Sequence, residues 1–247
     1  FADGNSSTFP VYKMIRQDVI LWCNARSEME GRKPAYYKDT SHTIVYRNGF
    51  QKLPDAYVDW TSNGYRLPTE AEWEKAARGG LRGYNYPTGN TTSPSTANTD
   101  ISGIGKTVAV GSYPPNAFGL YDMEGNVREF VWDGYTSDWY SKSQSMYPDP
   151  LGATVGSRPE VVIRGGSYNS SNSRIYIREK YVWDGKNNNF TSHGFRLVVS
   201  GERSPNMTKP TLTSDKNASG VIENPFSYSI EAVNSPTYFG ATGLPPG

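Results

Sequence analysis

Cysteine and histidine are scarce in this 247-residue chain, which holds one cysteine, Cys23, and two histidines, His42 and His193. A single cysteine excludes an internal disulfide and any paired-cysteine metal or redox motif. The two histidines form no i, i+4 pattern of the kind that binds metals, so we expect them to be structural. Cys23 falls on the apolar side of a predicted helix, which predicts a buried and unreactive thiol.

An excess charge of one sign and a long apolar run are also missing. The formal net charge is +1, so no basic surface for nucleic acid is expected. No apolar stretch approaches the roughly 20 residues that span a bilayer, so we expect no membrane span in this segment. The chain begins at Phe1 and ends at Gly247 inside a turn-like sequence. We therefore expect it to be an interior piece of a longer polypeptide.

Aromatic residues, by contrast, make up 13% of the chain, with 18 tyrosines, which is typical of a loop-rich globular domain. Two helices are expected in it. Residues 16–30 place Val19, Ile20 and Cys23 on neighbouring turns and end at Gly31. The second helix begins at the capping box Thr69-Glu70-Ala71-Glu72 and ends at Gly79.

The rest of the chain favours short strands and irregular segments. Tyr, Val and Ile alternate with polar residues over 32–63, and residues 80–115 have no period longer than a few residues. Residues 161–164 predict a strand that enters a tight glycine turn, and strands are also expected over 174–178 and 194–199. The expected domain spans residues 1–200. Residues 201–210 are expected to be a linker, and 211–247 the start of an all-β domain.

The stretch Asn116–Trp132 is too specific in composition to be an ordinary loop. Asp122 and Glu129 lie seven residues apart, with Gly125-Asn126 between them to turn the backbone. Calcium accepts carboxylates together with backbone carbonyls, so this spacing predicts a hard-cation site. The alternative is a Gly-Asn turn flanked by two solvated acids.

Four motifs in order resemble those of the formylglycine-generating-enzyme/sulfatase-modifying-factor domain family. They are Gly64-Tyr65-Arg66-Leu67-Pro68-Thr69-Glu70-Ala71-Glu72-Trp73-Glu74, Asn116–Trp132, Arg164-Gly165-Gly166-Ser167 and Gly194-Phe195-Arg196-Leu197. The resemblance implies an α+β, C-type-lectin-like fold with few helices, short strands, much irregular chain and bound calcium. From the same resemblance we expect the family's usual N-terminal part to be missing before Phe1.

Calcium ligands follow from this resemblance. It implies Asp122 and Glu129 as side-chain ligands and Met123, Gly125 and Val127 as carbonyl ligands. A second calcium site would lie near Asn98, Thr99, Ser102 and Ile104. The acidic ligand expected there is Ser102 in this chain, so that site would need Asp100 to shift in.

The resemblance also implies a lost activity. Catalytic members of the family carry two copper-binding cysteines after the Arg-Gly-Gly-Ser turn, and copper(I) needs such thiolates. Here residues 169–175 contain no sulfur, so the cysteine oxidase activity is not expected. The tail, with Pro225-Phe226-Ser227-Tyr228, resembles the immunoglobulin-like domains of large bacterial surface proteins.

Three functions remain open at this point. The first is a non-catalytic, calcium-stabilised recognition module of a secreted or cell-surface bacterial protein, acting in adhesion or in protein or glycan binding. The second is an enzyme of the same superfamily with other chemistry, using Ser167, Ser170, Arg178 or His193. The third is a structural subunit that assembles with copies of itself.

Candidate contact residues for a ligand gather after the Arg-Gly-Gly-Ser turn, where aromatic and amide side chains suit recognition. They are Tyr168, Asn169, Asn172, Arg174, Tyr176, Arg178, Trp183, Asn187, Asn188 and Asn189. The alternative is that they cover an ordinary surface, or that Arg174, Arg178 and Arg196 pair with acids inside the domain.

Overall fold

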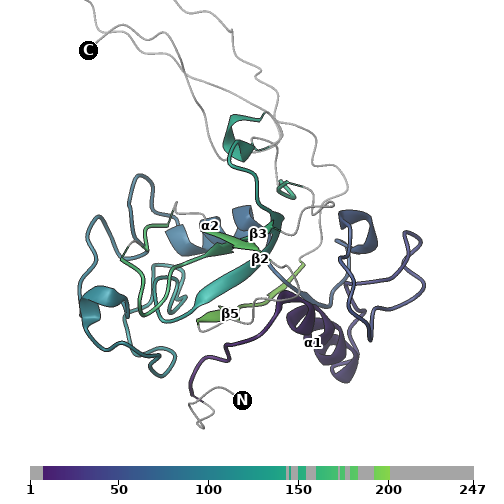
Figure 1. The fold of residues 1–247 in the computed structure, drawn as a ribbon, viewed down its shortest axis with the longest axis horizontal. Helices are drawn as coiled ribbons and strands as arrows, with labels where there is room; N and C mark the ends of the chain where they lie inside the picture. The colour runs from purple at the N-terminus through teal and green to yellow at the C-terminus, as the bar shows by residue number, and fades with distance from the viewer. Residues whose placement is uncertain are drawn as a thin grey trace, which may run out of the picture.

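A four-stranded mixed sheet lies at the centre of the computed structural model, in the order β4-β3-β2-β5 (Figure 1). β2 pairs antiparallel with β3 and parallel with β5, and β3 pairs antiparallel with β4. The strands are β2 (Arg128–Gly134), β3 (Glu160–Arg164), β4 (Glu179–Val182) and β5 (His193–Phe195). The structure describes residues 8–142, 145, 150–153, 160–171, 173–175, 179–182 and 192–200.

Two α-helices and a second, two-stranded sheet surround this centre. The helices are α1 (Arg16–Met29) and α2 (Glu70–Arg78), and the small sheet joins β1 (Tyr65–Arg66) to β6 (Val198–Val199). Short 3-10 turns occur at η1 (Asp55–Tyr57), η2 (Asp100–Ser102) and η3 (Trp139–Ser141). The fold is thus the predicted mixture of few helices, short strands and long irregular connections. No helix in the described ranges is long and apolar enough to cross a membrane.

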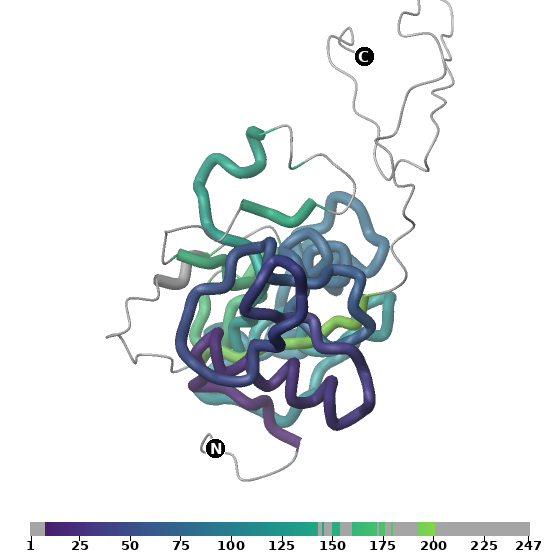
Figure 2. Tube along the Cα trace, turned by 90° about the vertical axis from the view of Figure 1, so that its right-hand side faces the viewer, coloured from purple at the N-terminus to yellow at the C-terminus, as the bar shows by residue number. Residues whose placement is uncertain are grey.

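β2 shows how the sheet is packed on both faces. Phe130 and Trp132 join the core cluster that contains Val19 and Ile20 of α1. Val131 points the other way, into the cluster that contains Trp73 of α2. Figure 2, seen from the α1 side, shows residues 8–63 in purple and dark blue in the foreground. The sheet is therefore buried between two layers, which fixes the position of each side chain along β2.

The sequence did not predict β2 as a strand. From Glu129 to Gly134 all of its residues are buried, so the strand lacks the alternation of polar and apolar residues that marks a half-exposed strand. The buried acids Glu129 and Asp133 also interrupt its apolar run. A strand that is buried on both faces and contains buried acids therefore shows neither the alternation nor the continuous apolar run by which strands are recognised in a sequence.

Both predicted helices are confirmed. In α1, Cys23 has no exposed surface, and burial raises the pKa of its thiol to about 12, which makes it unreactive as expected. In α2, the Thr69 hydroxyl accepts from the Glu72 N–H while the Glu72 carboxylate accepts from the Thr69 N–H. Gly79 ends the helix in the left-handed conformation, with φ 56°.

Two of the predicted strands differ from the observed ones. Residues 174 and 175 lie outside any strand, because the Ile175 N–H donates to the Asn85 carbonyl and its side chain enters the α2 core. Residues 176–178 of this prediction lie outside the described residues, and β4 is seen from Glu179. The closing strand over 194–199 is split into β5 and β6, which pair with different sheets. Between residues 32 and 63 only isolated bridges form, such as Tyr36 with Val58.

The predicted linker over 201–210 and the predicted immunoglobulin-like segment over 211–247 lie outside the described residues. Both stay predictions from the sequence.

Removing the cap of α2 provides a test of its part in stability. Thr69→Ala deletes the hydroxyl that accepts from Glu72, so we expect the free energy of unfolding to fall by about 1 kcal/mol. Urea unfolding measures the difference. Thr91→Ala, at an exposed loop position, is the control and should leave stability unchanged; equal stability of the two variants would contradict the role of the cap.

Candidate functional site

The carboxylate of Glu129 lies at the junction of three parts of the fold. Glu129 is at the start of β2 and only 5% exposed. Its Oε2 accepts from Trp73 Nε1 of α2 and from Arg196 Nε, each at 2.6 Å, and its Oε1 accepts from Arg196 Nη2 at 2.7 Å. This nearly buried ion pair joins β2, α2 and the segment between β5 and β6. Removing one partner of such a pair leaves an uncompensated charge in the interior.

The charges of Glu129 and Arg196 both act on the carboxyl group of Asp122. Its backbone has φ 55°, and its Oδ2 accepts from the Gly111 N–H at 2.8 Å. Its Oδ1 is buried and has no hydrogen-bond partner. Burial raises the pKa of Asp122, and the negative charge of Glu129 raises it further, while Arg196 opposes the rise. Arg196 Nη2 also donates to the Asp122 carbonyl at 3.5 Å, so both acids singled out from the sequence contact the same arginine.

The loop between the two acids is buried rather than solvated. Asn126 is 1% exposed, with φ 58°, and its side-chain amide bonds both the N–H and the carbonyl of Val108. Its backbone N–H donates to Asn98 O at 2.8 Å. A Cβ at Gly125 would lie 2.2 Å from that same Asn98 oxygen, so only glycine fits there. The alternative of a turn between two solvated acids is wrong, at least for the buried Glu129.

These residues fit a calcium ion at the first loop. Asp122, Glu129 and Arg196 carry a formal net charge of −1, and one buried carboxylate oxygen lacks a partner, which a divalent cation would satisfy. Within the described ranges no three Asp, Glu, His or Cys side chains group closely enough to hold a metal. An ion would therefore also depend on backbone carbonyls. The residues that would hold it are Asp122, Met123, Gly125, Val127 and Glu129.

The second predicted calcium loop does not fit an ion. The Ser102 hydroxyl donates to Asn98 Oδ1 at 2.9 Å and to Thr99 O at 2.7 Å. These are the oxygens that a cation would need. Asp100, the other candidate acid, is exposed. The loop is therefore closed by a neutral hydroxyl, where the family pattern calls for an acid.

The buried side chain of Arg164 holds the Arg-Gly-Gly-Ser turn in place. The Arg164 side chain has no exposed surface, pairs with Glu74 at 2.5 Å and with Glu70 at 3.6 Å, and lies over the Trp73 ring. Gly165 and Gly166 both have positive φ, 87° and 68°. The Gly165 carbonyl accepts from the Gly125 N–H at 2.9 Å. This bond links the glycine turn to residues 122–129, called here the cation loop.

Residues 167–175 are called here the display loop, and among its described residues, 167–171 and 173–175, buried side chains alternate with ones that reach the surface. Ser167, Ser170 and Ser173 are at most 5% exposed. Ser170 Oγ accepts from the Ser167 N–H at 2.9 Å, and Ser173 Oγ donates to Glu124 Oε1 at 2.7 Å. Burial raises the pKa of Glu124, and the hydroxyls of Ser173 and Thr92 oppose the rise. The three serines therefore attach the loop to the domain.

The side chains between these serines reach the surface. Asn169 and Ser171 are exposed, and Tyr168 and Arg174 are half-buried. The structure thus brings Tyr168, Asn169 and Arg174 of the predicted contact residues onto one short loop. The other predicted contacts, Asn172, Tyr176, Arg178, Trp183, Asn187, Asn188 and Asn189, lie outside the described residues.

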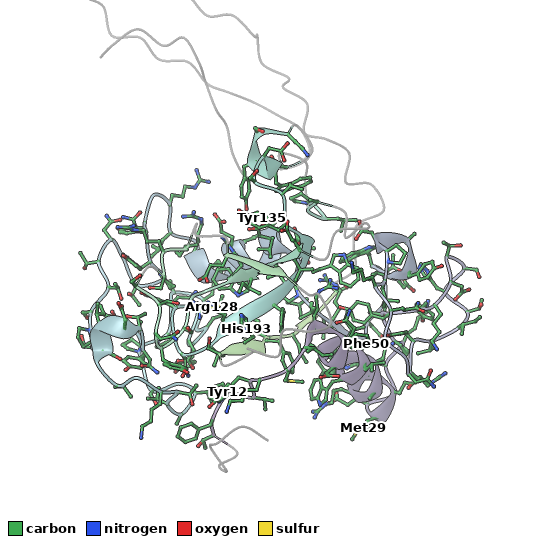
Figure 3. All side chains as sticks on the ribbon, in the orientation of Figure 1. Tyr12, Met29, Phe50, Arg128, Tyr135 and His193 are labelled. Atoms are coloured by element: carbon green, nitrogen blue, oxygen red, sulfur yellow. The ribbon has the colours of Figure 1, made fainter. Side chains whose placement is uncertain are left out.

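Arg128, which is labelled in Figure 3, was not predicted as a site residue, although its side chain contacts this loop. Its Nε pairs with Glu179 of β4 at 2.8 Å, and its Nη1 donates to Ser192 Oγ at 2.9 Å and to Ser167 Oγ. Ser167 Oγ in turn donates to Asn169 Oδ1 at 2.7 Å. The adjacent Arg128-Glu129 pair could have been recognised only with β2 known, since consecutive residues of a strand face opposite ways.

His193 also lies at this end of the sheet, next to Arg128 in Figure 3. Its ring stacks on Phe130, with ring centroids 5.8 Å apart. Burial, assisted by the positive charge of Arg128, lowers its pKa from 6.5 to about 4. The side chain is therefore neutral at physiological pH, as suits a structural histidine.

The sheet order, the capped α2 and the glycine turn define a C-type-lectin-like domain. The chain belongs to the sulfatase-modifying factor enzyme 1-like domain family, whose model matches residues 5–201. The resemblance of the four sequence motifs and the predicted fold class are thereby confirmed.

Relatives with different names share this domain. A formylglycine-generating enzyme of Streptomyces coelicolor is 35% identical over 70% of this chain and 55% of its own length. The serine/threonine-protein kinase pkn1 of Chlamydia pneumoniae is 42% identical over 53% of this chain and 21% of its own length. The chaperone protein LppX of Paenibacillus barcinonensis is 33% identical over 55% of this chain and 54% of its own length. The chain thus spans between about a fifth and just over half of these relatives.

Two solved structures resemble the domain. Treponema denticola variable protein 1 matches with a TM-score of 0.66 and 28% identity, over 81% of this chain and 74% of that protein. CarF matches with a TM-score of 0.62 and 27% identity, over 80% of this chain and 70% of that protein. Proteins with different names thus share the scaffold described here.

His193 should make stability depend on pH. Because folding lowers its pKa from 6.5 to about 4, the unfolded chain takes up a proton between these values that the folded chain does not. Its contribution is complete above pH 6.5 and is lost as the pH falls toward 4. His193→Gln should therefore reduce the difference in urea midpoint between pH 7 and pH 5. Asn90→Gln, at an exposed position, is the control and should keep the wild-type difference; an unreduced difference in His193→Gln would count against this assignment.

Proposed function

We propose that the domain is a non-catalytic recognition module whose display loop presents side chains to a protein or glycan ligand. The observation that carries this proposal is the alternation along the described residues 167–171 and 173–175. Three buried serines fix the backbone, Tyr168, Asn169 and Ser171 between them are exposed or half-buried, and Arg174 after Ser173 is half-buried. Binding residues commonly lie on loops that a rigid scaffold positions, and pre-organisation lowers the entropy lost when a ligand binds.

The sulfur content supports a role without the family's oxidase chemistry. Copper(I) prefers soft thiolate ligands, and residues 167–175 supply serine and asparagine instead. Cys23, the single cysteine, is buried in α1 and belongs to the core. Ser167 does not suit a nucleophile, since its hydroxyl donates to the amide oxygen of Asn169 and accepts from Arg128. A catalytic serine would need a general base in that position.

The similarity to Treponema denticola variable protein 1 supports the same proposal. A protein named as variable on this scaffold is in keeping with a fold that tolerates different residues at its surface. The buried anchors described above would allow this, because Ser167, Ser170 and Ser173 hold the backbone while the residues between them contribute little to the core.

We further propose that calcium at the first loop stabilises the module and that the module is displayed outside the bacterial cell. Calcium would compensate the buried Asp122 oxygen and stiffen the loop on which the Gly-Gly turn rests. The sequence of residues 211–247, which resembles surface immunoglobulin-like domains, supports an extracellular or cell-surface setting. Adhesion through a bound ligand and assembly with copies of the same chain are both compatible with this placement.

Substitutions on the display loop test the proposed recognition surface. Asn169→Ala and Arg174→Ala should weaken binding on a glycan or bacterial-protein array several-fold, because they remove side chains that reach the surface, and circular dichroism of each variant checks that the domain stays folded. Asn90→Ala, at an exposed position outside the loop, is the matched control. Oxygen consumption with a thiol peptide and added copper above a protein-free blank would contradict the non-catalytic assignment.

Calcium dependence is tested by thermal melting with calcium and with EGTA. At a calcium concentration a hundred times the dissociation constant, the expected stabilisation is about 2.7 kcal/mol. Asp122→Asn should remove most of this difference, and Asp100→Asn should retain it because the second loop does not fit an ion. Equal melting temperatures with calcium and with EGTA in the wild-type protein would sink the calcium proposal.

A further inference from the structure

The chain contains two Asn-Gly pairs, Asn48-Gly49 and Asn63-Gly64, and the structure holds them differently. An asparagine followed by glycine loses its side-chain amide most readily, because glycine has no side chain to hinder its own backbone nitrogen. That nitrogen attacks the side-chain carbonyl carbon of the asparagine. The rate therefore depends on whether the two atoms can meet and on whether the carbonyl is polarised.

Asn48 and Gly49 are both exposed, in the loop in which Figure 3 labels Phe50. An ion pair between Arg47 and Glu28, at 2.6 Å, joins this loop to α1. Gly49 has φ 101°, and a Cβ there would meet no atom within 4 Å. Among the described residues, none accepts a hydrogen bond from the Gly49 N–H. The nitrogen is therefore free to approach the Asn48 side chain.

A lysine is bonded to the carbonyl group that would be attacked. Lys38 Nζ donates to Asn48 Oδ1 at 2.9 Å and lies 5.7 Å from the centroid of the Tyr46 ring. Tyr46 is buried, and its hydroxyl donates to the Gly49 carbonyl at 2.8 Å. An ammonium group in this position stabilises the negative charge that develops on the oxygen when the carbonyl carbon is attacked.

The second pair is held in a way that hinders the same reaction. The Gly64 N–H donates to Ser62 Oγ at 2.9 Å, and Asn63 Oδ1 accepts from the Lys33 N–H at 2.9 Å. Gly64 is buried, and a Cβ there would lie 2.2 Å from the Lys33 carbonyl oxygen. Ring closure at Asn63 therefore requires this segment to open first.

We propose that Asn48 is a site of spontaneous deamidation that Lys38 assists. The Gly49 nitrogen bonds to Asn48 Cγ and loses its proton, while the bond from Cγ to the amide nitrogen breaks and ammonia leaves. Water then opens the resulting cyclic imide at one of its two carbonyl groups, which gives aspartate or isoaspartate at position 48. Because one carboxylate is gained, the formal net charge falls from +1 to 0.

The product differs from the original loop in both charge and backbone. Lys38 faces a carboxylate where it had bonded an amide oxygen, and isoaspartate lengthens the backbone by one carbon next to the carbonyl that Tyr46 holds. The modified fraction increases with the age of the protein, since the reaction needs only water. The site lies outside the display loop and the cation loop, so this proposal depends on neither.

The test is incubation of the full chain at neutral pH in water enriched in heavy oxygen, followed by pepsin digestion at acidic pH and mass spectrometry. Asn48 should take up the label about tenfold faster than Asn63, because only the second site must open first. In urea, where neither site is folded, the two rates should become similar. Fragmentation of the peptides should find both aspartate and isoaspartate at position 48.

Lys38→Met tests the part that the lysine plays. It removes the donor to Asn48 Oδ1 and keeps an apolar side chain against Tyr46, so deamidation of Asn48 should slow several-fold in the folded protein. Label uptake at Asn63 should stay as slow as in the wild-type protein, which shows that the fold is intact. Lys75→Met, at an exposed position of α2, is the matched control and should keep the wild-type rate at Asn48.

Three outcomes would count against the proposal. Label uptake at Asn63 as fast as at Asn48 in the folded protein would show that the fold does not select the site. Loss of ammonia at Asn48 without label, in a peptide joined to Lys38, would indicate a cross-link through the lysine amine. An unchanged rate in Lys38→Met would reject assistance by the lysine. The first two use the wild-type protein and do not depend on the folding of a variant.

Discussion

The ion pair between Glu129 and Arg196 is the interaction on which the arrangement of this domain depends. It joins the start of β2 to the segment between β5 and β6, and Trp73 of α2 completes it as a third donor. Because Glu129 is nearly buried, its charge is tolerated only with these donors in place. The cation loop, the glycine turn and the closing strands are therefore positioned relative to one another by one carboxylate.

Further hydrogen bonds and ion pairs fix the positions of the loops between this ion pair and the surface. Arg164 fixes the glycine turn through its ion pair with Glu74. Asn126 joins the cation loop to Asn98 and Val108 by hydrogen bonds. Ser167, Ser170 and Ser173 then attach the display loop to this frame. Loops with little regular secondary structure are thus held by side-chain hydrogen bonds, which is consistent with a fold that is largely irregular and yet specific.

Much of this architecture could be predicted from local sequence signals, but the centre of the sheet could not. The α2 cap and its glycine end are short-range patterns, and the four motifs together identified the family. β2 was not predicted because it is buried on both faces and contains two buried acids, Glu129 and Asp133. Arg128 was missed for a related reason, since its partner Ser167 lies 39 residues away in the chain. Pairing of Arg196 with an internal acid was one of the alternatives left open by the sequence, but its partner Glu129, 67 residues away, could not be named. Long-range polar pairing leaves no local pattern to detect.

The pairing of Tyr65 with Val199 in the small sheet has a consequence for folding kinetics. Like the Glu129–Arg196 contact, this pairing joins residues synthesised early to residues close to the end of the domain, so it cannot form until those late residues have been synthesised. Such non-local closure slows folding and exposes apolar surface to aggregation in the meantime. On the ribosome, β1 and β2 can therefore pair with β6 and β5 only after residues 193–199 have left the exit tunnel.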